Sequence, residues 1–240
     1  MVHINGATKS QRVAAMFSRI SRKYDFMNTV MTGGAHKRWR RLTAEMATRG
    51  LPPGPALDVG TGTGDLSFEL ARRPEVSWVV GVDFVAEMLA LAQIKEQRLP
   101  AKRPIVWSLG DALTLPFPDS TFMCATAGFT MRNVADLHRA ISEMARVVRP
   151  GGRVVVLELT PPEERYHVSR LLARCFSYLA PLLGYLLAKD REAYTYLPRS
   201  VENFPTAGAL ALLMANAGLK NVDWQLLSMG LVALHVGEVT

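Results

Sequence analysis

Three glycines at alternate positions form a predicted ligand-binding loop in the stretch LDVGTGTGDLSFEL, residues 57–70. Gly60, Gly62 and Gly64 follow a short apolar run and precede a helical pattern, the place where an α/β backbone approaches a nucleotide. A dinucleotide fingerprint would carry its third glycine where this chain has Asp65. A carboxylate at that helix N-terminus repels a pyrophosphate. The loop therefore disfavours a dinucleotide, and without Gly-Lys-Ser/Thr it is no Walker P-loop.

A ligand with an adenosine and a positively charged end fits this loop better, and S-adenosylmethionine is such a ligand. Its sulfonium and ammonium favour nearby oxygens, which the bare glycine loop and Asp58 can offer. Asp58 could instead be purely structural. Asp83 ends the next apolar run, where an acidic side chain can bind both ribose hydroxyls or cap the following helix.

A third polar edge lies in GDALTLPF, residues 110–117. Asp111 could bind the adenine amino group, and Ala112 offers its backbone. Ligands of open α/β sheets bind outside the carboxyl ends of the strands, so these edges should converge on one crevice.

The elements that position these residues follow from the periodicity. Apolar runs cover residues 56–60, 78–83, 105–111, 122–129 and 152–159, and helical patterns cover 65–73, 85–97 and 134–148. This alternation predicts an α/β fold, a parallel sheet covered on both faces. Further helices are predicted within 10–50, 163–196 and 207–218. Two strand runs in 220–239, split near Gly230, predict a closing antiparallel hairpin.

Composition predicts one globular domain over residues 1–240, since 49% of the chain is apolar and 20% charged. The two cysteines, Cys124 and Cys175, form no disulfide framework or metal motif, which favours a reducing cytoplasm and no metal. Neither a secretory signal nor a membrane span is expected. The net charge of +7 suits a nucleic acid, an anionic substrate or a membrane surface.

The loop, Asp83 and Asp111 resemble those of Rossmann-like class I S-adenosylmethionine-dependent methyltransferases. From about residue 13 to 238, the chain is similar to the ubiquinone and menaquinone biosynthesis C-methyltransferase family. The most specific motifs are Tyr24-Asp25-x-Met27-Asn28, Arg132-Asn133 and Ala233-Leu234-His235-x-Gly237. The resemblance implies a seven-stranded, mostly parallel sheet with a C-terminal antiparallel hairpin. Helices in residues 1–50 would lie over the active site, and the insertion at 163–196, after strand five, would cover the substrate.

The resemblance implies that Thr63, Asp83, Asp111 and Ala112 bind S-adenosylmethionine. Gly128 stands where many members have a serine that touches this cofactor, and Thr130 replaces a glycine. We therefore expect one hydroxyl contact fewer at the end of strand four.

The implied reaction is methyl transfer to a ring carbon of a reduced, isoprenoid-tailed quinone. Demethylmenaquinol is the first candidate acceptor, and a benzoquinol intermediate is the second. Arg132 would stabilise the phenolate that makes the ring carbon nucleophilic, and would hold a water that accepts the ring proton. Asn133 would bind the second ring oxygen, and Tyr24 would close the pocket. We interpret His235 as a core histidine.

Two other classes stay open: a methyltransferase for an amine, phenol oxygen or sterol, and a non-catalytic cofactor-binding protein at a membrane surface. A nucleic-acid partner is disfavoured, because [DN]-P-P-[YF] is absent after strand four. The expected partner is a lipophilic quinol. A cytoplasmic protein could meet it at the inner face of the membrane through the apolar run at 175–188, and a homodimer is compatible with the composition.

Overall fold

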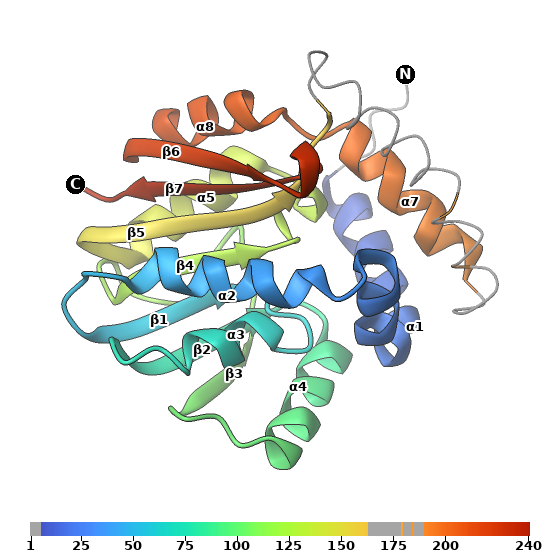
Figure 1. Cartoon of the computed structure of the whole chain (residues 1–240), viewed down its shortest axis with the longest axis horizontal. Helices are drawn as coiled ribbons and strands as arrows, with labels where there is room; N and C mark the ends of the chain where they lie inside the picture. The colour runs from blue at the N-terminus through green and yellow to red at the C-terminus, as the bar shows by residue number, and fades with distance from the viewer. Residues whose placement is uncertain (1–5, 163–178, 180–183, 185–189) are drawn as a thin grey trace.

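The computed structural model describes residues 6–162, 179, 184 and 190–240, and its centre is a seven-stranded mixed sheet (Figure 1). The strands are β1 (Gly54–Val59), β2 (Val76–Asp83), β3 (Ile105–Leu109), β4 (Phe122–Gly128), β5 (Val148–Leu159), β6 (Lys220–Leu227) and β7 (Val232–Glu238). Their order is β3-β2-β1-β4-β5-β7-β6. The first five strands in this order, β3 to β5, pair in parallel with their neighbours. Strand β7 pairs antiparallel with both β5 and β6. The predicted sheet and its closing hairpin are confirmed.

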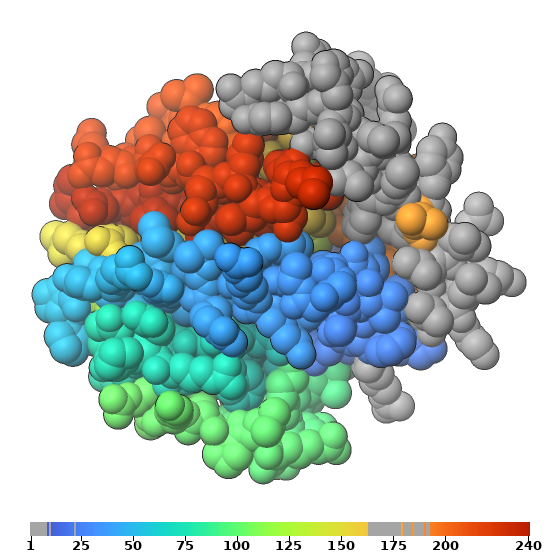
Figure 2. Space-filling view, viewed as in Figure 1, coloured from blue at the N-terminus to red at the C-terminus, as the bar shows by residue number. Residues whose placement is uncertain are grey.

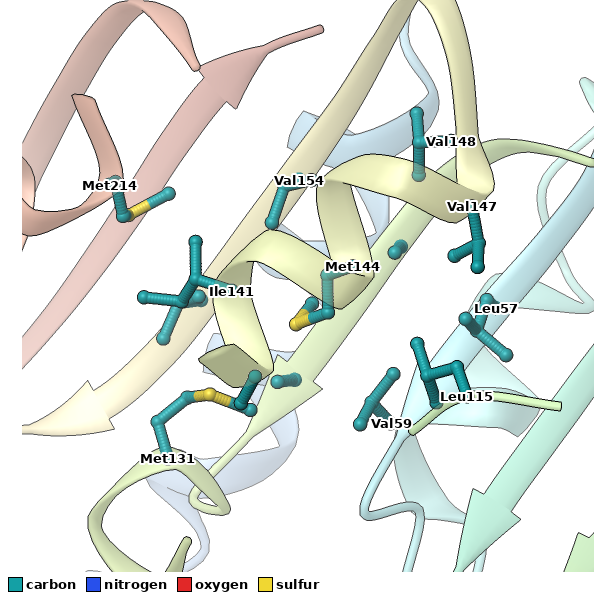
Figure 3. Packing of buried hydrophobic residues seen from close by; sticks show 14 of the residues in the cluster. Leu57, Val59, Leu115, Met131, Ile141, Met144, Val147, Val148, Val154 and Met214 are labelled. Atoms are coloured by element: carbon teal, nitrogen blue, oxygen red, sulfur yellow. The ribbon is translucent and has the colours of Figure 1, made fainter. Parts of the chain in front are cut away.

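Helices cover both faces of this sheet. They are α1 (Gly6–Thr32), α2 (Ala35–Thr48), α3 (Asp65–Leu70), α4 (Ala86–Arg98), α5 (Leu137–Val147), α7 (Arg191–Glu202) and α8 (Ala207–Asn216). Successive strand residues point to opposite faces, so each buried strand feeds two cores. In β5, Val154 and Val156 join the core under α5 and α8, whereas Val155 and Leu157 join the core under α2 and α3. Figure 3 shows the first of these cores, with Met144 of α5 among its residues.

Several strand boundaries differ from the predicted ones, and the differences at β3 and β5 have a visible cause. β3 ends at Leu109, because the Asp111 carboxylate accepts the Leu113 N–H at 2.9 Å and turns the chain. β5 begins earlier than expected, at Val148, which pairs with Phe122 before a shift in register. Both differences come from side-chain turns and bulges, which periodicity does not report.

The predicted helical insertion at 163–196 is described only at Leu179, Gly184 and its end, where α7 begins. The predicted substrate cover and membrane-surface segment otherwise lie outside the described residues, as does Cys175. Cys124 is fully buried in β4, as expected for a small core residue. In the described part of the chain, no helix is long and apolar enough to cross a bilayer.

The helices α1 and α7 lie together beyond the carboxyl ends of the parallel strands (Figure 1). In the space-filling view, α1 and α2 form a blue band between the C-terminal elements and α3 with α4 (Figure 2). Strand order reverses between β1 and β4, so the crevice expected for a ligand opens at this same edge.

Candidate functional site

The glycine loop is held by the neighbouring strand. The Gly60 and Thr61 N–H groups both donate to the Val82 carbonyl, at 2.8 and 2.9 Å. Gly60, Gly62 and Gly64 all have positive φ, which disfavours any side chain there. A Cβ on Gly60 would also lie 2.4 Å from the Thr130 hydroxyl oxygen. Open space surrounds Gly62, the position where a ligand can come nearest to the backbone.

Thr130, the departure from the family pattern, ties the loop to β4. Its hydroxyl donates to the Gly60 carbonyl at 3.0 Å and lies 3.3 Å from the Gly128 carbonyl. The Thr130 side chain therefore fills the space next to Gly60. It also connects the glycine loop to the end of β4, where Gly128 has no side chain of its own. The residues at positions 128 and 130 therefore do not argue against ligand binding at this loop.

Asp58 is fully buried at the end of β1, and hydroxyl groups surround its carboxylate. Thr61 and Ser67 donate to Oδ2 at 2.8 Å each, and Thr126 donates to Oδ1 at 3.1 Å. Burial raises the pKa of Asp58 to about 6 despite these bonds. A nearby cation would stabilise its charged form.

Asp83, at the end of β2, also has its carboxylate beside the glycine loop. Oδ2 accepts the Gly62 N–H at 2.8 Å, and Oδ1 accepts the Val85 N–H at 2.9 Å. Burial raises its pKa, although these backbone bonds favour the charged form. Asp83 thus holds the loop and the start of α4, and each oxygen keeps a lone pair for a further donor.

A polar cavity opens at this edge, which we call the loop cavity. Six predicted cofactor residues line it, namely Asp58, Gly60, Gly62, Thr63, Asp83 and Gly128. Gly64 does not line it, because its backbone faces the ring of Trp107. Asp111 and Ala112 line neither the loop cavity nor its neighbour in the described structure, so their cofactor role stays a prediction.

A second cavity adjoins the first, and we call it the apolar cavity. It has an empty volume of about 760 Å³. Residues of α1, α2 and α7 form most of its walls, including Ile20, Met31, Trp39 and Leu197. Phe17, Tyr24 and Phe129 line both cavities. These shared walls place a polar pocket directly beside an apolar one.

Arg132 lines the apolar cavity and pairs with a carboxylate that the sequence analysis missed. Its Nη1 lies 2.5 Å from Glu158 Oε1, with the two side chains 6% and 0% exposed. Within the described residues, the Arg132 Nε is buried without a hydrogen-bond partner. One sequence signal could have found Glu158: an acid within the buried strand run VVVLEL needs a cation.

Asn133, predicted to bind the second ring oxygen, lines the loop cavity and not the apolar one. Its Nδ2 donates to the Phe129 carbonyl at 3.3 Å, and its Oδ1 accepts the Tyr196 hydroxyl at 3.2 Å. This placement does not favour the predicted role. It makes Asn133 a link between α7 and the end of β4.

Charged side chains tie α1 to the glycine loop. Asp25 accepts the Thr63 hydroxyl at 2.6 Å and pairs with Lys95 at 2.7 Å. Lys95 also pairs with Asp65 at 2.7 Å, and Arg40 of α2 pairs with Asp65 at 3.1 Å. Burial pushes the pKa of Asp65 up, but the two cations outweigh it and lower the pKa. Asp65 is therefore an ionised carboxylate, consistent with the predicted bias against a phosphate.

His235 is confirmed as a core histidine. It is 1% exposed, its Nε2 lies 2.9 Å from the Ala207 carbonyl, and its ring stacks on Trp224. Burial lowers its pKa, so it is neutral near pH 7. It lines neither cavity in the described structure.

The sequence of the chain is similar to those of known methyltransferases. Residues 5–239 match the model of the ubiE/COQ5 methyltransferase family. A demethylmenaquinone methyltransferase of Thermus thermophilus is 42% identical over 93% of this chain and 99% of its own length. A ubiquinone/menaquinone biosynthesis C-methyltransferase of Teredinibacter turnerae is 37% identical over 98% of this chain and 94% of its own.

Solved methyltransferase structures share the fold of this chain. A SAM-dependent methyltransferase structure from Aquifex aeolicus superposes with a TM-score of 0.56 at 16% identity, covering 86% of this chain and 98% of its own. The Rossmann-like class I methyltransferase fold predicted from the sequence is thereby confirmed.

Proposed function

The chain belongs to the ubiE/COQ5 methyltransferase family, and from that premise we propose that it methylates a ring carbon of demethylmenaquinol, a reduced isoprenoid quinone. Like its family, it is an S-adenosylmethionine-dependent C-methyltransferase. The observation that carries the choice of acceptor is the apolar cavity beside the loop cavity, with the buried, unpartnered Arg132 Nε in its wall.

The loop cavity fits S-adenosylmethionine, which supplies an electrophilic methyl group when bound. The open space at Gly62 admits an adenosyl group close to the backbone. Asp83 would accept hydrogen bonds from the ribose hydroxyls with its remaining lone pairs. Asp58, whose pKa is about 6, would be held in its charged form by a cationic ligand.

In the apolar cavity, Arg132 would stabilise the acceptor's oxyanion. A hydroquinone carbon becomes nucleophilic when the neighbouring hydroxyl gives its proton to water, and the Arg132 Nε–H can donate to the resulting oxygen. Glu158 holds the guanidinium in place from the other side. An arginine keeps its proton, so a water bound to Arg132 would accept the proton from the ring.

The aromatic walls would orient the ring and exclude water. Tyr24 and Phe129 border both cavities, so an acceptor ring between them would face the methyl donor. Such positioning lowers the activation free energy by on the order of 7 to 11 kcal/mol at best. Tyr24 also packs edge to face on Phe17, seven residues earlier on the same helix, and this contact restricts the orientation of both rings in the cavity wall.

A side-by-side methyl-transfer assay tests this function. Demethylmenaquinol and its benzoquinol counterpart are offered with labelled S-adenosylmethionine, both kept reduced, and an amine and a phenol serve as unrelated acceptors. We expect the highest kcat/KM with demethylmenaquinol. Faster methylation of the amine or of the phenol oxygen would overturn the proposal, and preference for the benzoquinol would change the acceptor.

An isoprenoid-tailed acceptor resides in a membrane, and we propose that the α1 side of the protein meets it there. Phe26 and Val30, one turn apart on α1, expose 56% and 39% of their surface. The chain's net charge of +7 favours an anionic bilayer. Phe26→Ser should weaken sedimentation with anionic vesicles, whereas unchanged sedimentation would exclude α1 from the contact.

A further inference from the structure

Asn28 is a polar side chain on the face of α1 that lines the apolar cavity. Its neighbours on that face, Ile20, Tyr24 and Met31, are large and mostly apolar. The family motif that contains Tyr24 also contains Asn28, yet the proposed function has so far used only the tyrosine. The question is what an amide does in this wall.

The Asn28 amide nitrogen is buried and has no hydrogen-bond partner among the residues that the structure describes. The nearby Thr32 hydroxyl donates to the Asn28 backbone carbonyl at 2.7 Å and forms no hydrogen bond with the Asn28 amide nitrogen. Buried donors are almost always paired, so an unpaired one in a cavity wall is available to an acceptor in that cavity. In the described structure, the two buried unpartnered side-chain atoms that belong to this cavity's lining are Asn28 Nδ2 and Arg132 Nε.

We propose that Asn28 binds the second ring oxygen of the acceptor, the one farther from the carbon that is methylated. A hydroquinone has two oxygens on opposite sides of its ring, and two residues that line the apolar cavity have unpartnered N–H donors in the described structure: Asn28 on α1 and Arg132 on the 3-10 turn Met131–Asn133 after β4. Arg132 takes the oxygen next to the reacting carbon, and Asn28 takes the other. This inference rests on the proposed function.

The positions of the other candidates support this assignment. Asn133 has both ends of its amide bonded and lines the loop cavity. Both ring nitrogens of His36 are engaged as well, Nε2 with Thr29 at 3.2 Å and Nδ1 with Arg40. Asn28 lines the apolar cavity but not the loop cavity, so it borders the cavity proposed for the acceptor and not the one proposed for the methyl donor.

Two variants and two acceptors test the proposal. Asn28→Leu removes the donor at similar size, and Asn28→Asp keeps the shape but replaces the N–H by an acceptor. Asn216→Leu, an exposed position on α8, is the matched control. Each protein is assayed with demethylmenaquinol and with the naphthol that keeps only the hydroxyl next to the accepting carbon. S-adenosylhomocysteine affinity is measured for each variant.

We expect kcat/KM for the quinol to fall about tenfold in Asn28→Leu and at least as far in Asn28→Asp. With the naphthol, parent and variants should differ by less than twofold, and S-adenosylhomocysteine affinity should not change. Equal losses with both acceptors would mean a merely structural role and overturn the proposal. If Asn28→Leu does not fold, parent-like quinol methylation by Asn28→Asp overturns it. A parent that methylates neither acceptor would instead refute the proposed function itself.

Discussion

The loop cavity and the apolar cavity share a wall but satisfy their polar groups in opposite ways. In the loop cavity, Asp58 is bonded by three hydroxyls and Asp83 by two backbone N–H groups. In the apolar cavity, Asn28 and Arg132 each keep a buried N–H without a partner. One site is complete before its ligand arrives, and the other is completed by it.

This difference predicts how each site responds to mutation. In a prebuilt site, a substitution disturbs the protein's own hydrogen bonds, so stability and cofactor affinity change together. In a site that waits for its ligand, a substitution at the free donor changes turnover more than folding. The four predictions below test that contrast, from the largest expected effect to the smallest.

Substitution of Arg132 gives the largest expected effect and tests whether the apolar cavity depends on an unpartnered donor. Arg132→Ala removes the free Nε and leaves Glu158 buried without its cation, which should cost about 3 to 5 kcal/mol of stability. Arg132→Lys keeps a charge beside Glu158 and should fold, yet kcat should fall about 100-fold because the donor at the oxyanion is lost. Urea unfolding and single-turnover assays measure the two effects.

The matched control for this experiment is Arg139→Lys, on the exposed side of α5. S-adenosylhomocysteine affinity should be the same in parent, Arg132→Lys and control. If Arg132→Lys turned over quinol at the parental rate, Arg132 would be a structural cation only, and the apolar cavity would lose half of its evidence for a waiting site.

Asp58 tests the prebuilt site through pH. Burial raises its pKa from 3.8 to about 6, so below pH 3.8 both folded and unfolded chains carry the proton. Between about pH 4 and 6 the unfolded chain releases it first, and the parent loses up to about 3 kcal/mol of stability relative to Asp58→Asn. Urea unfolding at a series of pH values measures this difference, with Asp223→Asn as the exposed control.

The same linkage has a functional side. A cationic ligand favours ionised Asp58, so S-adenosylmethionine affinity should decline as pH falls through 6, and Asp58→Asn should lose this dependence. A parent whose stability difference from Asp58→Asn stays flat across this range would show that Asp58 is ionised throughout.

The sequence predicted the two cavities unequally, for a physical reason. The strands, the glycine loop and Asp83 lie in local patterns, and parallel strands bring their carboxyl ends together without further information. The apolar cavity is assembled from α1, α2, α7 and the end of β4, which are far apart in the chain. Only the family resemblance connected Tyr24 with Arg132.

Side-chain pairing was the part that periodicity could not supply. The Arg132 to Glu158 pair joins the 3-10 turn after β4 to the end of β5, and the Asp25 to Thr63 bond joins α1 to the loop. The Arg132-Asn133 motif predicted that both side chains bind the acceptor. The two residues lie on a short 3-10 turn, Met131–Asn133, and Asn133 lines the loop cavity whereas Arg132 lines the apolar cavity. Adjacent residues on such a turn face different directions, which a motif does not reveal.

Asp83 sharpens the comparison on the cofactor side. Asp83→Ala should raise the Kd of S-adenosylhomocysteine by about 10- to 150-fold, equal to 1.5 to 3 kcal/mol for a charged hydrogen bond. Because the apolar cavity is untouched, kcat at saturating cofactor should stay within a few fold. Asp136→Ala, which removes a comparable backbone cap from α5, is the control. Parental affinity in Asp83→Ala would refute the ribose assignment.

Asp25 carries the smallest effect and asks whether the two cavities are independent. It joins α1, a wall of the apolar cavity, to Thr63 and Lys95 beside the loop cavity. Its side chain is 42% exposed, so screening limits the ion pair to less than about 1 kcal/mol. Asp25→Asn should therefore barely change stability, and Asp119→Asn, an exposed partner of Arg146, is the matched control.

The informative readout for Asp25→Asn is the pattern of binding constants at low and high salt. If Asp25 holds α1 against the loop, the quinol KM and the cofactor Kd should both rise about two- to fivefold at low salt, and the parent should approach the variant as salt screens the pair. A rise in quinol KM alone would mean that α1 moves without disturbing the loop. That outcome would make the contrast between the cavities complete, because even their shared helix would act on only one of them.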